Sequence, residues 1–406
     1  MSRGFKPLLN ISFLLGVSCQ SSFSDLDLFV LSEMQRSNTT PLDTTNQWDG
    51  NTQAIAFGEQ LFFSTAISPD DITCASCHNP DLGFTDGQPQ AIGAGTTLRH
   101  SPTLFDMAAH SWFRWDGGCD SLWCQAIGPI ESSVEMNSSR TYLVHALSQD
   151  SELRLQYESL FGNLPDVSTL PLIAKPTSQD TEANDAWNTL SANQQIEITQ
   201  VLVNTTKSIA AFEATIQSQD TIFDQFLGAL VGPNTSESEA LALLTEEEEQ
   251  GLRLFVGEGG CHFCHNGPTL SNDAFHNIGL GTRDWLETTD IGRYDGITML
   301  QTSPFNAGGE WSDDPNGTRA GRIDRLIQNA EQLGQFKTPT LRNLFQKAPY
   351  MHGGHFDTIE EVITHYSKLE ESSVQGHSDE TLKPLNWTDE QQQAMIAFLR
   401  TLDDSL

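Results

Sequence analysis

Basic residues are scarce in this chain of 406 residues: 21 Lys and Arg stand against 54 Asp and Glu, which gives a formal net charge of −33. A surface with that charge repels nucleic acid and anionic membranes, so neither is expected as a partner. The acidity suits either of two purposes, which the sequence leaves open: attraction of a basic protein partner, or solvation in salty surroundings. Beyond the N-terminal region, no stretch is long and apolar enough to predict a membrane-spanning helix.

Strand signals are also few and short, so the chain is expected to be mainly α-helical. One helix is predicted over 54–63, and another over 196–216, where apolar residues recur at helical spacing. Thr245 and Thr388 each begin a capping-box pattern, which predicts the start of a helix at both places. Residues 165–192 are polar and contain proline, and they are expected to form a connector.

The N-terminus has the pattern of an export signal. Basic residues precede a short apolar stretch that ends in small residues, which predicts that residues 1–19 are a secretory signal and that the protein is periplasmic. Cys19 ends a sequence similar to a bacterial lipoprotein box. The alternatives are a lipid anchor at Cys19, as in an outer-membrane lipoprotein, or plain cleavage. Residues 20–50 are rich in Ser, Thr, Asn and Asp, which predicts a flexible tether.

Two Cys-x-x-Cys-His motifs stand in the chain: Cys74, Cys77 and His78 form the first, and Cys261, Cys264 and His265 form the second. This spacing is the attachment signature of c-type haem. The two thiols form thioethers with the vinyl groups, and the imidazole of the next residue reaches the iron from the same side. The motifs therefore predict two covalently bound haems c. A Cys/His zinc site is the alternative, and two complete motifs in an exported chain argue against it.

Two further cysteines, Cys119 and Cys124, are expected to form a disulfide. Export places them in an oxidising compartment, and their close spacing permits the bond if the backbone turns there. Between His78 and Arg99 there is neither His nor Met. The first haem is therefore expected to lack a nearby protein ligand on its distal side, and an open iron face admits a small oxidant.

The two halves of the chain share a pattern: a helix that ends in Phe, a turn of small residues and then a haem motif. This repeat predicts a mainly α fold of two tandem cytochrome c-like haem domains. The expected bounds are 51–205 for the first domain and 206–406 for the second, with the last helix free to pack back on the first domain.

Eight further segments accompany the haem motifs in order: Leu61-Phe-Phe63, Ser101-Pro-Thr-Leu-Phe105, Trp115-Asp-Gly117, Gln125-Ala-Ile-Gly-Pro-Ile130, Val134-Glu-Met136, Lys337-Thr-Pro-Thr-Leu-Arg-Asn343, Ala348-Pro-Tyr-Met-His352 and Ile396-Ala-Phe-Leu-Arg-Thr-Leu402. With them, residues 52–405 resemble the bacterial di-haem cytochrome c peroxidase and MauG family. The resemblance implies an oxidoreductase of the cytochrome-c peroxidase type, with a peroxidatic haem in the first domain and an electron-transfer haem in the second.

The resemblance also assigns residues to the first haem, with His78 as the proximal iron ligand. Glu135 matches the family's distal carboxylate, which moves a proton during O–O cleavage, and Gln125 matches another distal position. Trp115 matches the tryptophan that relays electrons between the haems. The alternatives are a surface carboxylate for Glu135 and core packing for Trp115, which lies in an aromatic-rich stretch.

At the second haem, the resemblance makes His265 the proximal ligand and Tyr366 the other iron ligand. Peroxidases usually have Met at that position, whereas MauG has Tyr. A hard oxygen ligand suits a high oxidation state of the iron, in which an oxidising equivalent can be stored. A tyrosine of the core is the alternative for Tyr366. His352 matches a family histidine near the interface of the haem domains.

Some positions depart from the family pattern. Gly118 replaces the Arg that commonly ends Trp-Asp-Gly-Arg, and the distal His of peroxidases that need reductive activation is absent. The family's calcium site corresponds here to His100, Lys347 and Pro349, and His is a poor ligand for so hard a cation, which argues against calcium. Residues 283–335 are longer than in the simplest members, so the docking face is expected to differ.

Three functions follow as hypotheses. In the first, the protein reduces hydrogen peroxide with electrons from a small basic periplasmic redox protein, either a cytochrome c or a cupredoxin. In the second, which Tyr366 favours, it is a MauG-like oxidase that draws electrons from the side chains of a partner protein. In the third, it is a di-haem electron carrier or sensor without turnover. Gln125, Glu135 and the lack of a strong ligand in 79–99 argue against the third.

Overall fold

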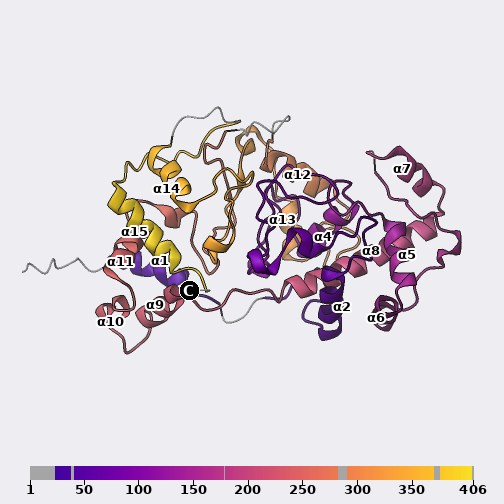
Figure 1. Cartoon of the computed structure of the whole chain (residues 1–406), viewed down its shortest axis with the longest axis horizontal. Helices are drawn as coiled ribbons and strands as arrows, with labels where there is room; N and C mark the ends of the chain where they lie inside the picture. The colour runs from indigo at the N-terminus through magenta and orange to yellow at the C-terminus, as the bar shows by residue number, and fades with distance from the viewer. Residues whose placement is uncertain (1–22, 38–40, 178, 282–289, 370–374, 405–406) are drawn as a thin grey trace, which may run out of the picture.

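The computed structural model describes residues 23–37, 41–177, 179–281, 290–369 and 375–404. Within these residues the chain is mainly helical, as the sequence predicts, and the helices gather in two lobes (Figure 1). Helices α2 and α4 to α8 belong to one lobe, and α1, α9 to α11, α14 and α15 to the other (Figure 1). No helix in this part of the chain is both long and apolar enough to cross a bilayer.

The helices of the first lobe are α2 (Thr52–Phe63), α3 (Cys74–Cys77), α4 (Leu122–Glu131), α5 (Arg140–Gln149), α6 (Ser151–Phe161), α7 (Thr181–Asn188) and α8 (Ala192–Glu213). Those of the second lobe are α1 (Asp25–Glu33), α9 (Ile222–Leu230), α10 (Glu237–Leu241), α11 (Glu246–Val256), α14 (Ile359–Lys368) and α15 (Asp389–Arg400). Two more, α12 (Arg293–Thr302) and α13 (Thr318–Ile323), come from the long segment that precedes α14. The 3-10 helices are η1 (Pro80–Leu82), η2 (Met107–Ala109), η3 (Val167–Thr169), η4 (Cys261–Phe263), η5 (Ala330–Gln332) and η6 (Leu344–Gln346).

The sequence-based expectations for four helices are confirmed. Helix α2 covers the predicted stretch 54–63, and α8 covers most of 196–216. Helices α11 and α15 begin directly after Thr245 and Thr388, and both capping boxes are formed. The expected scarcity of strands is confirmed as well, because the described residues contain only β1 (Phe275–His276) and β2 (Phe336–Lys337), which pair antiparallel.

The first lobe is built around α8, which is buried along most of its length and packs against α2 and α4. Helices α2 and α8 cross closely at Gly58, where an added Cβ would overlap the carbonyl oxygen of Ser208. Glycine is therefore required there for the backbones to approach. Phe57, Phe62 and Trp123 fill the surrounding core.

The second lobe also contains a close helix crossing at a glycine. Helix α11 crosses α15 at Gly251, where an added Cβ would overlap the carbonyl oxygen of Ala394. Phe255 and Phe398 pack across the same contact, with ring centroids 5.1 Å apart. Helix α15 therefore belongs to the second core.

The two lobes have separate hydrophobic cores. The first core continues along the chain as far as Ile216, because α8 runs without a break through the expected domain boundary at 205 and 206. Buried apolar residues from Phe223 to Leu402 contribute to the second core.

The N-terminal segment differs from its prediction. Residues 20–50 were expected to form a flexible tether, but α1 lies within them, and Phe23, Leu31 and Met34 are buried in the second core. The tether prediction is wrong for this helix because its apolar side chains find a tertiary partner, which the polar composition of 20–50 as a whole does not reveal. The predicted signal (1–19) and the candidate lipid site Cys19 lie outside the described residues.

The long segment of residues 290–335 follows the second haem motif in sequence but lies against the first lobe (Figure 1). Phe305 enters the first core. The backbone N–H of Ala307 donates to the Asp120 carboxylate at 2.9 Å, and the Asp313 carboxylate pairs with Lys207 at 2.7 Å. This part of the chain therefore packs against the first lobe, so the described part of the predicted insertion has a structural role.

Candidate haem centres

The first Cys-x-x-Cys-His motif follows α2 and forms the short helix α3. Thr73 caps this helix, with both capping-box hydrogen bonds formed to Ser76. The His78 ring then lies with Nδ1 3.1 Å from the carbonyl oxygen of Phe84, a residue whose φ of 58° lies in the left-handed region. Burial lowers the pKa of His78. A neutral imidazole with Nδ1 held by a carbonyl presents Nε2, which is the usual arrangement of a metal-binding histidine.

The second motif repeats this geometry after α11. The His265 ring has Nδ1 3.0 Å from the carbonyl oxygen of Leu270, whose φ is 53°. Burial lowers the pKa of His265 to about 4. Both motif histidines are therefore neutral at pH 7 and oriented by a carbonyl that comes five or six residues later in the chain.

A second internal repeat supports each motif, and the sequence analysis missed it. Ser101-Pro-Thr103 lies beside the first motif and Thr338-Pro-Thr340 beside the second. Thr103 Oγ1 donates to the Gly83 carbonyl and Thr340 Oγ1 donates to the Thr269 carbonyl, each at 2.7 Å. The shared Pro-Thr-Leu sequence was the signal that could have revealed this repeat.

The four motif cysteines are not paired in disulfides and are partly buried. Burial raises the pKa of Cys77 and Cys261 to about 12 and that of Cys264 to about 11. The burial of both sulfurs beside a neutral histidine fits a covalently held apolar macrocycle better than a metal bound directly to thiolates.

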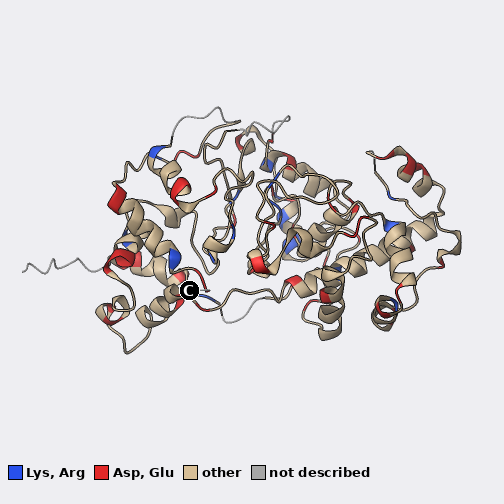
Figure 2. Cartoon of the chain, viewed as in Figure 1, with Lys and Arg blue, Asp and Glu red and all other residues tan. Residues whose placement is uncertain are grey.

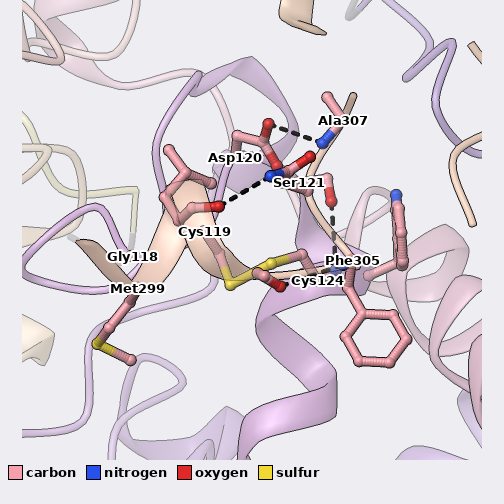
Figure 3. The surroundings of a disulfide bond; sticks show 12 residues. Gly118, Cys119, Asp120, Ser121, Cys124, Met299, Phe305 and Ala307 are labelled. Atoms are coloured by element: carbon pink, nitrogen blue, oxygen red, sulfur yellow. Dashed lines mark hydrogen bonds between the residues drawn. A yellow bond between two sulfur atoms is a disulfide. The ribbon is translucent and has the colours of Figure 1, made fainter. Parts of the chain in front are cut away.

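Gln125 lies on α4, on the face of this helix that is only partly buried. Six residues of α4 are buried, whereas Gln125, Gly128 and Pro129 are only partly buried and share one face through their spacing of three and four. The predicted disulfide joins Cys119 to Cys124 at the start of this helix (Figure 3). It therefore fixes the preceding loop to the turn that carries Gln125.

Glu135 follows α4 in a turn that folds back on the helix end. Its backbone N–H is 3.3 Å from the Ser132 carbonyl, and the next residue's N–H donates to the Pro129 carbonyl at 3.0 Å. The Glu135 carbonyl accepts the N–H of Ala94 at 2.8 Å, which brings in the loop that follows the first motif. The Glu135 carboxylate also raises the pKa of Cys77, which places it near the first motif.

Trp115 lies between the two Pro-Thr segments. Its indole Nε1 donates to the carbonyl of His100 at 2.8 Å, and its own carbonyl accepts the backbone N–H of Lys337 at the same distance. His100 directly precedes one Pro-Thr segment and Lys337 the other. The indole is thus fixed at the junction of the two motif regions, and its ring centroid lies 6.5 Å from that of His352.

Tyr366 lies on α14 and faces the second motif. Burial raises its pKa, and the charges of Cys261 and Cys264 raise it further, so the phenol is close to both cysteines. The adjacent His365 points elsewhere, with Nε2 3.0 Å from the Ile278 carbonyl. Tyr366 is therefore the side chain of this helix turned toward the second candidate haem.

His352 stacks on Phe336, with ring centroids 3.5 Å apart and an interplanar angle of 9°. Its backbone carbonyl accepts the N–H of His100 at 2.8 Å. Burial lowers the pKa of His352 well below its usual value, so this ring is neutral. His352 thereby ties the region of the second motif to that of the first.

The imidazole of His100 lies at the position matched to the family's calcium site. The His100 side chain is buried, and its Nδ1 is 2.7 Å from the Gln88 carbonyl. Burial lowers the pKa of His100, and hydrogen bonds to the backbones of Gln88 and Lys347 act in the opposite direction. The ring thus engages the backbone of Lys347, one of the two residues whose carbonyls a cation would need there. Across the described ranges, no group of three or more His, Cys, Asp or Glu is arranged to hold a metal ion.

Comparison with known proteins agrees with this geometry. Residues 52–230 match the family model of the di-haem cytochrome c peroxidases. The chain is 28% identical over 353 residues to the methylamine utilization protein MauG of Methylorubrum extorquens, covering 86% of this chain and 78% of the relative. The resemblance of the sequence to the bacterial di-haem cytochrome c peroxidase and MauG family is thereby confirmed.

Other matches point the same way. The chain is 28% identical over 356 residues to the cytochrome-c peroxidase IdrP2 of Pseudomonas sp. strain SCT, covering 87% of this chain and 82% of the relative. The crystal structure of the diheme peroxidase BthA from Burkholderia thailandensis superposes with a TM-score of 0.63 at 19% identity, covering 90% of this chain and 88% of that one. The family has two haem cofactors, and the expectation of an oxidoreductase of the cytochrome-c peroxidase type is confirmed.

Proposed function

We propose that this chain is a periplasmic di-haem c-type peroxidase that reduces hydrogen peroxide with electrons from a small redox protein. The single observation that carries the proposal is an asymmetry between two otherwise equivalent motifs. Both motif histidines are neutral and anchored through Nδ1. On the segments beside the first lie a carboxylate and an amide, Glu135 and Gln125, at the positions that match the family's distal groups, whereas a phenol, Tyr366, lies close to the cysteines of the second.

The residues present fit two covalent haems. Cys74 and Cys77 would form the thioethers of the first haem, and Cys261 and Cys264 those of the second. The chemistry that the first haem supplies is the reduction of peroxide at its iron. The other steps of the reaction are those of the protein's own groups.

Glu135 provides the proton transfer in this proposal. Its carboxylate accepts a proton from the peroxide oxygen that binds and returns it to the oxygen that leaves as water. Gln125 orients the bound peroxide with its amide, from the partly exposed face of α4. Trp115, hydrogen-bonded to His100 next to one motif region and to Lys337 next to the other, provides the route for electrons between the haems.

Tyr366 and His265 would hold the iron of the second haem, and that haem would then supply electron storage instead of a site for peroxide. This feature also supports the second candidate function, a MauG-like oxidation of a partner protein's side chains, because an oxygen ligand favours a high oxidation state. Relatives named MauG and relatives named cytochrome-c peroxidase match this chain equally well.

The lobes correspond to two haem domains in this proposal, with residues 51–205 containing the peroxidatic site and 206–406 the electron-transfer site. A lipid anchor at Cys19 would hold the protein at a membrane. Acidic residues are distributed over both lobes (Figure 2), which suits a small basic cytochrome c or cupredoxin as electron donor. His100 stands at the family's calcium position and engages the backbone of Lys347, and we infer that no calcium binds there.

The test is stopped-flow spectroscopy of the purified diferric protein. Addition of peroxide without reductant should change the haem spectrum within seconds, and a reduced small cytochrome should then be oxidised with two molecules consumed per peroxide. Oxidation of a partner protein's side chains in place of the cytochrome would favour the MauG-like function. A spectrum that peroxide leaves unchanged would show a carrier without turnover and contradict both catalytic proposals.

A further inference from the structure

Arg114 immediately precedes Trp115 in a loop that closes on itself. Phe113 N–H donates to the Cys119 carbonyl at 2.8 Å, so the loop begins and ends at one bridge. Arg114 has a φ of 65°, in the left-handed region that a residue with a side chain adopts only at a cost in conformational energy. Such a backbone is retained where the surrounding structure holds the side chain in a particular place.

That place is the surface of α4 at Gly128. A Cβ added to Gly128 would overlap Nη2 of Arg114 and lie 3.1 Å from the central carbon of the guanidinium. The charged group therefore rests directly on the helix, and glycine is the residue that leaves room for it. The Cys119–Cys124 disulfide fixes the other end of the same loop to the first turn of α4 (Figure 3).

The guanidinium thus lies on the polar face described above. Gly128 is three residues after Gln125 and next to Pro129, on the stripe of α4 that is only partly buried. The turn carrying Glu135 folds back onto the same end of the helix through the Pro129 carbonyl. The amide, carboxylate and guanidinium groups therefore come from three segments that meet along α4.

The charge of Arg114 has no counter-ion in the part of the chain that the structure describes. There its guanidinium donates no hydrogen bond, and no carboxylate lies within 4 Å of it, although it is partly buried. Two other buried or partly buried arginines have carboxylate partners: Arg140 pairs with Glu131 at 3.0 Å, and Arg99 pairs with Asp290 at 2.8 Å. A guanidinium held in place without a carboxylate is suited to an anion that arrives from outside.

We propose that Arg114 is an anion-binding residue on the distal side of the first haem, where it holds a small anion at the open iron position beside Gln125 and Glu135. The proposal rests on the proposed function, which makes that face the peroxide site. In the reaction, one proton passes from hydrogen peroxide to the Glu135 carboxylate, and the hydroperoxide anion that results is stabilised by the guanidinium charge. No redox step is involved at this stage.

Fluoride binding to the diferric protein tests the proposal without turnover. We expect Arg114→Leu to weaken fluoride affinity, measured by absorption spectroscopy, by tenfold or more, and Arg114→Lys to weaken it less, because a charge remains without the planar fork. Gly128→Ala keeps the arginine but displaces its guanidinium, and should also weaken fluoride binding. Arg154→Leu removes an exposed arginine of α6 that pairs with Glu158, and it is the matched control, with unchanged affinity.

Both haems should remain attached in every variant, as the pyridine haemochrome spectrum reports. Parent-like fluoride affinity in Arg114→Leu, with peroxide still reacting in the parent, would overturn the role of Arg114 and leave the proposed function standing. A shifted reduction potential with parent-like fluoride affinity would overturn it as well, because it would indicate contact with a haem propionate. A parent protein that reacts with neither peroxide nor fluoride would overturn both proposals.

Discussion

The two motif regions share a frame, which consists of a helix crossing and the hydrogen bonds around the motif histidine. They differ in the side chains that lie near this frame. In each, a helix crosses its neighbour at a glycine, Gly58 or Gly251, and delivers the motif. In each, a threonine hydroxyl and a backbone carbonyl hold the loop around the motif histidine. The first frame faces a disulfide-braced helix with polar groups on its exposed stripe, whereas the second faces Tyr366.

This difference indicates that one scaffold serves two purposes according to the group opposite the histidine. In the proposed function, the repeated frame holds the proximal side of each haem. The side chains to which that proposal gives distinct roles come from the loop 113–119, α4 and the turn after it in the first region, and from α14 in the second.

Removal of the Glu135 carboxylate is the largest expected effect, because it would abolish the distinguishing feature of the first region. Glu135→Gln should slow the spectral reaction with peroxide by about 100-fold or more, the range typical of a lost acid–base group. Glu152→Gln, an exposed position in the first turn of α6, is the control and should react like the parent. Parent-like kinetics in Glu135→Gln would remove this residue from the mechanism.

Substitution of the two crossing glycines should affect both regions alike, because the frame is shared. Gly58→Val and Gly251→Val each place atoms in a neighbouring backbone and should lower the free energy of unfolding by about 1–3 kcal/mol. Gly228→Ala in α9 meets open space and serves as the control, with stability unchanged or raised. Denaturant titration measures all three, and a tolerated valine at either crossing would contradict the close approach.

Glu213, at the end of α8, is a further difference between the regions. It is 4% exposed, burial raises its pKa to about 8, and its charge would raise the pKa of Cys74 in the first motif. The folded state therefore holds this proton more tightly than the unfolded state. The stability associated with it is present below pH 4.5 and is lost as the pH rises toward 8.

Glu213→Gln cannot ionise and should flatten this pH dependence, with a gain on the order of 1–3 kcal/mol above pH 8. Chemical denaturation at several pH values measures it. A variant with the same pH profile as the parent would show that Glu213 does not carry the proton.

The smallest expected effect is that of calcium removal. An imidazole is a poor ligand for calcium, and that of His100 engages the backbone of Lys347 at the corresponding site, so a chelator should leave the Tm and the peroxide reaction unchanged. Loss of activity on chelation that calcium restores would contradict this account.

The sequence predicted the features that local chemistry determines. The haem motifs follow from covalent chemistry, and the helices after Thr245 and Thr388 follow from capping side chains. Helix α1 escaped prediction because its segment is polar overall and its burial depends on a distant core.

The contact between Arg114 and Gly128 also escaped prediction. It depends on how the loop 113–119 closes and on where the disulfide places it, and neither is visible in residue spacing. The repeated Pro-Thr-Leu sequence could have been found, since it is a local pattern that occurs beside each motif.

The most direct test of the central claim, that the group opposite each histidine decides the role of its haem, is the electron paramagnetic resonance spectrum of the diferric parent and of Tyr366→Phe. The account predicts one open and one closed ferric haem in the parent, and two open haems in the variant, with both still covalently attached. Identical spectra for the two proteins would show that Tyr366 is not an iron ligand, and the proposed difference between the haems would fall with it.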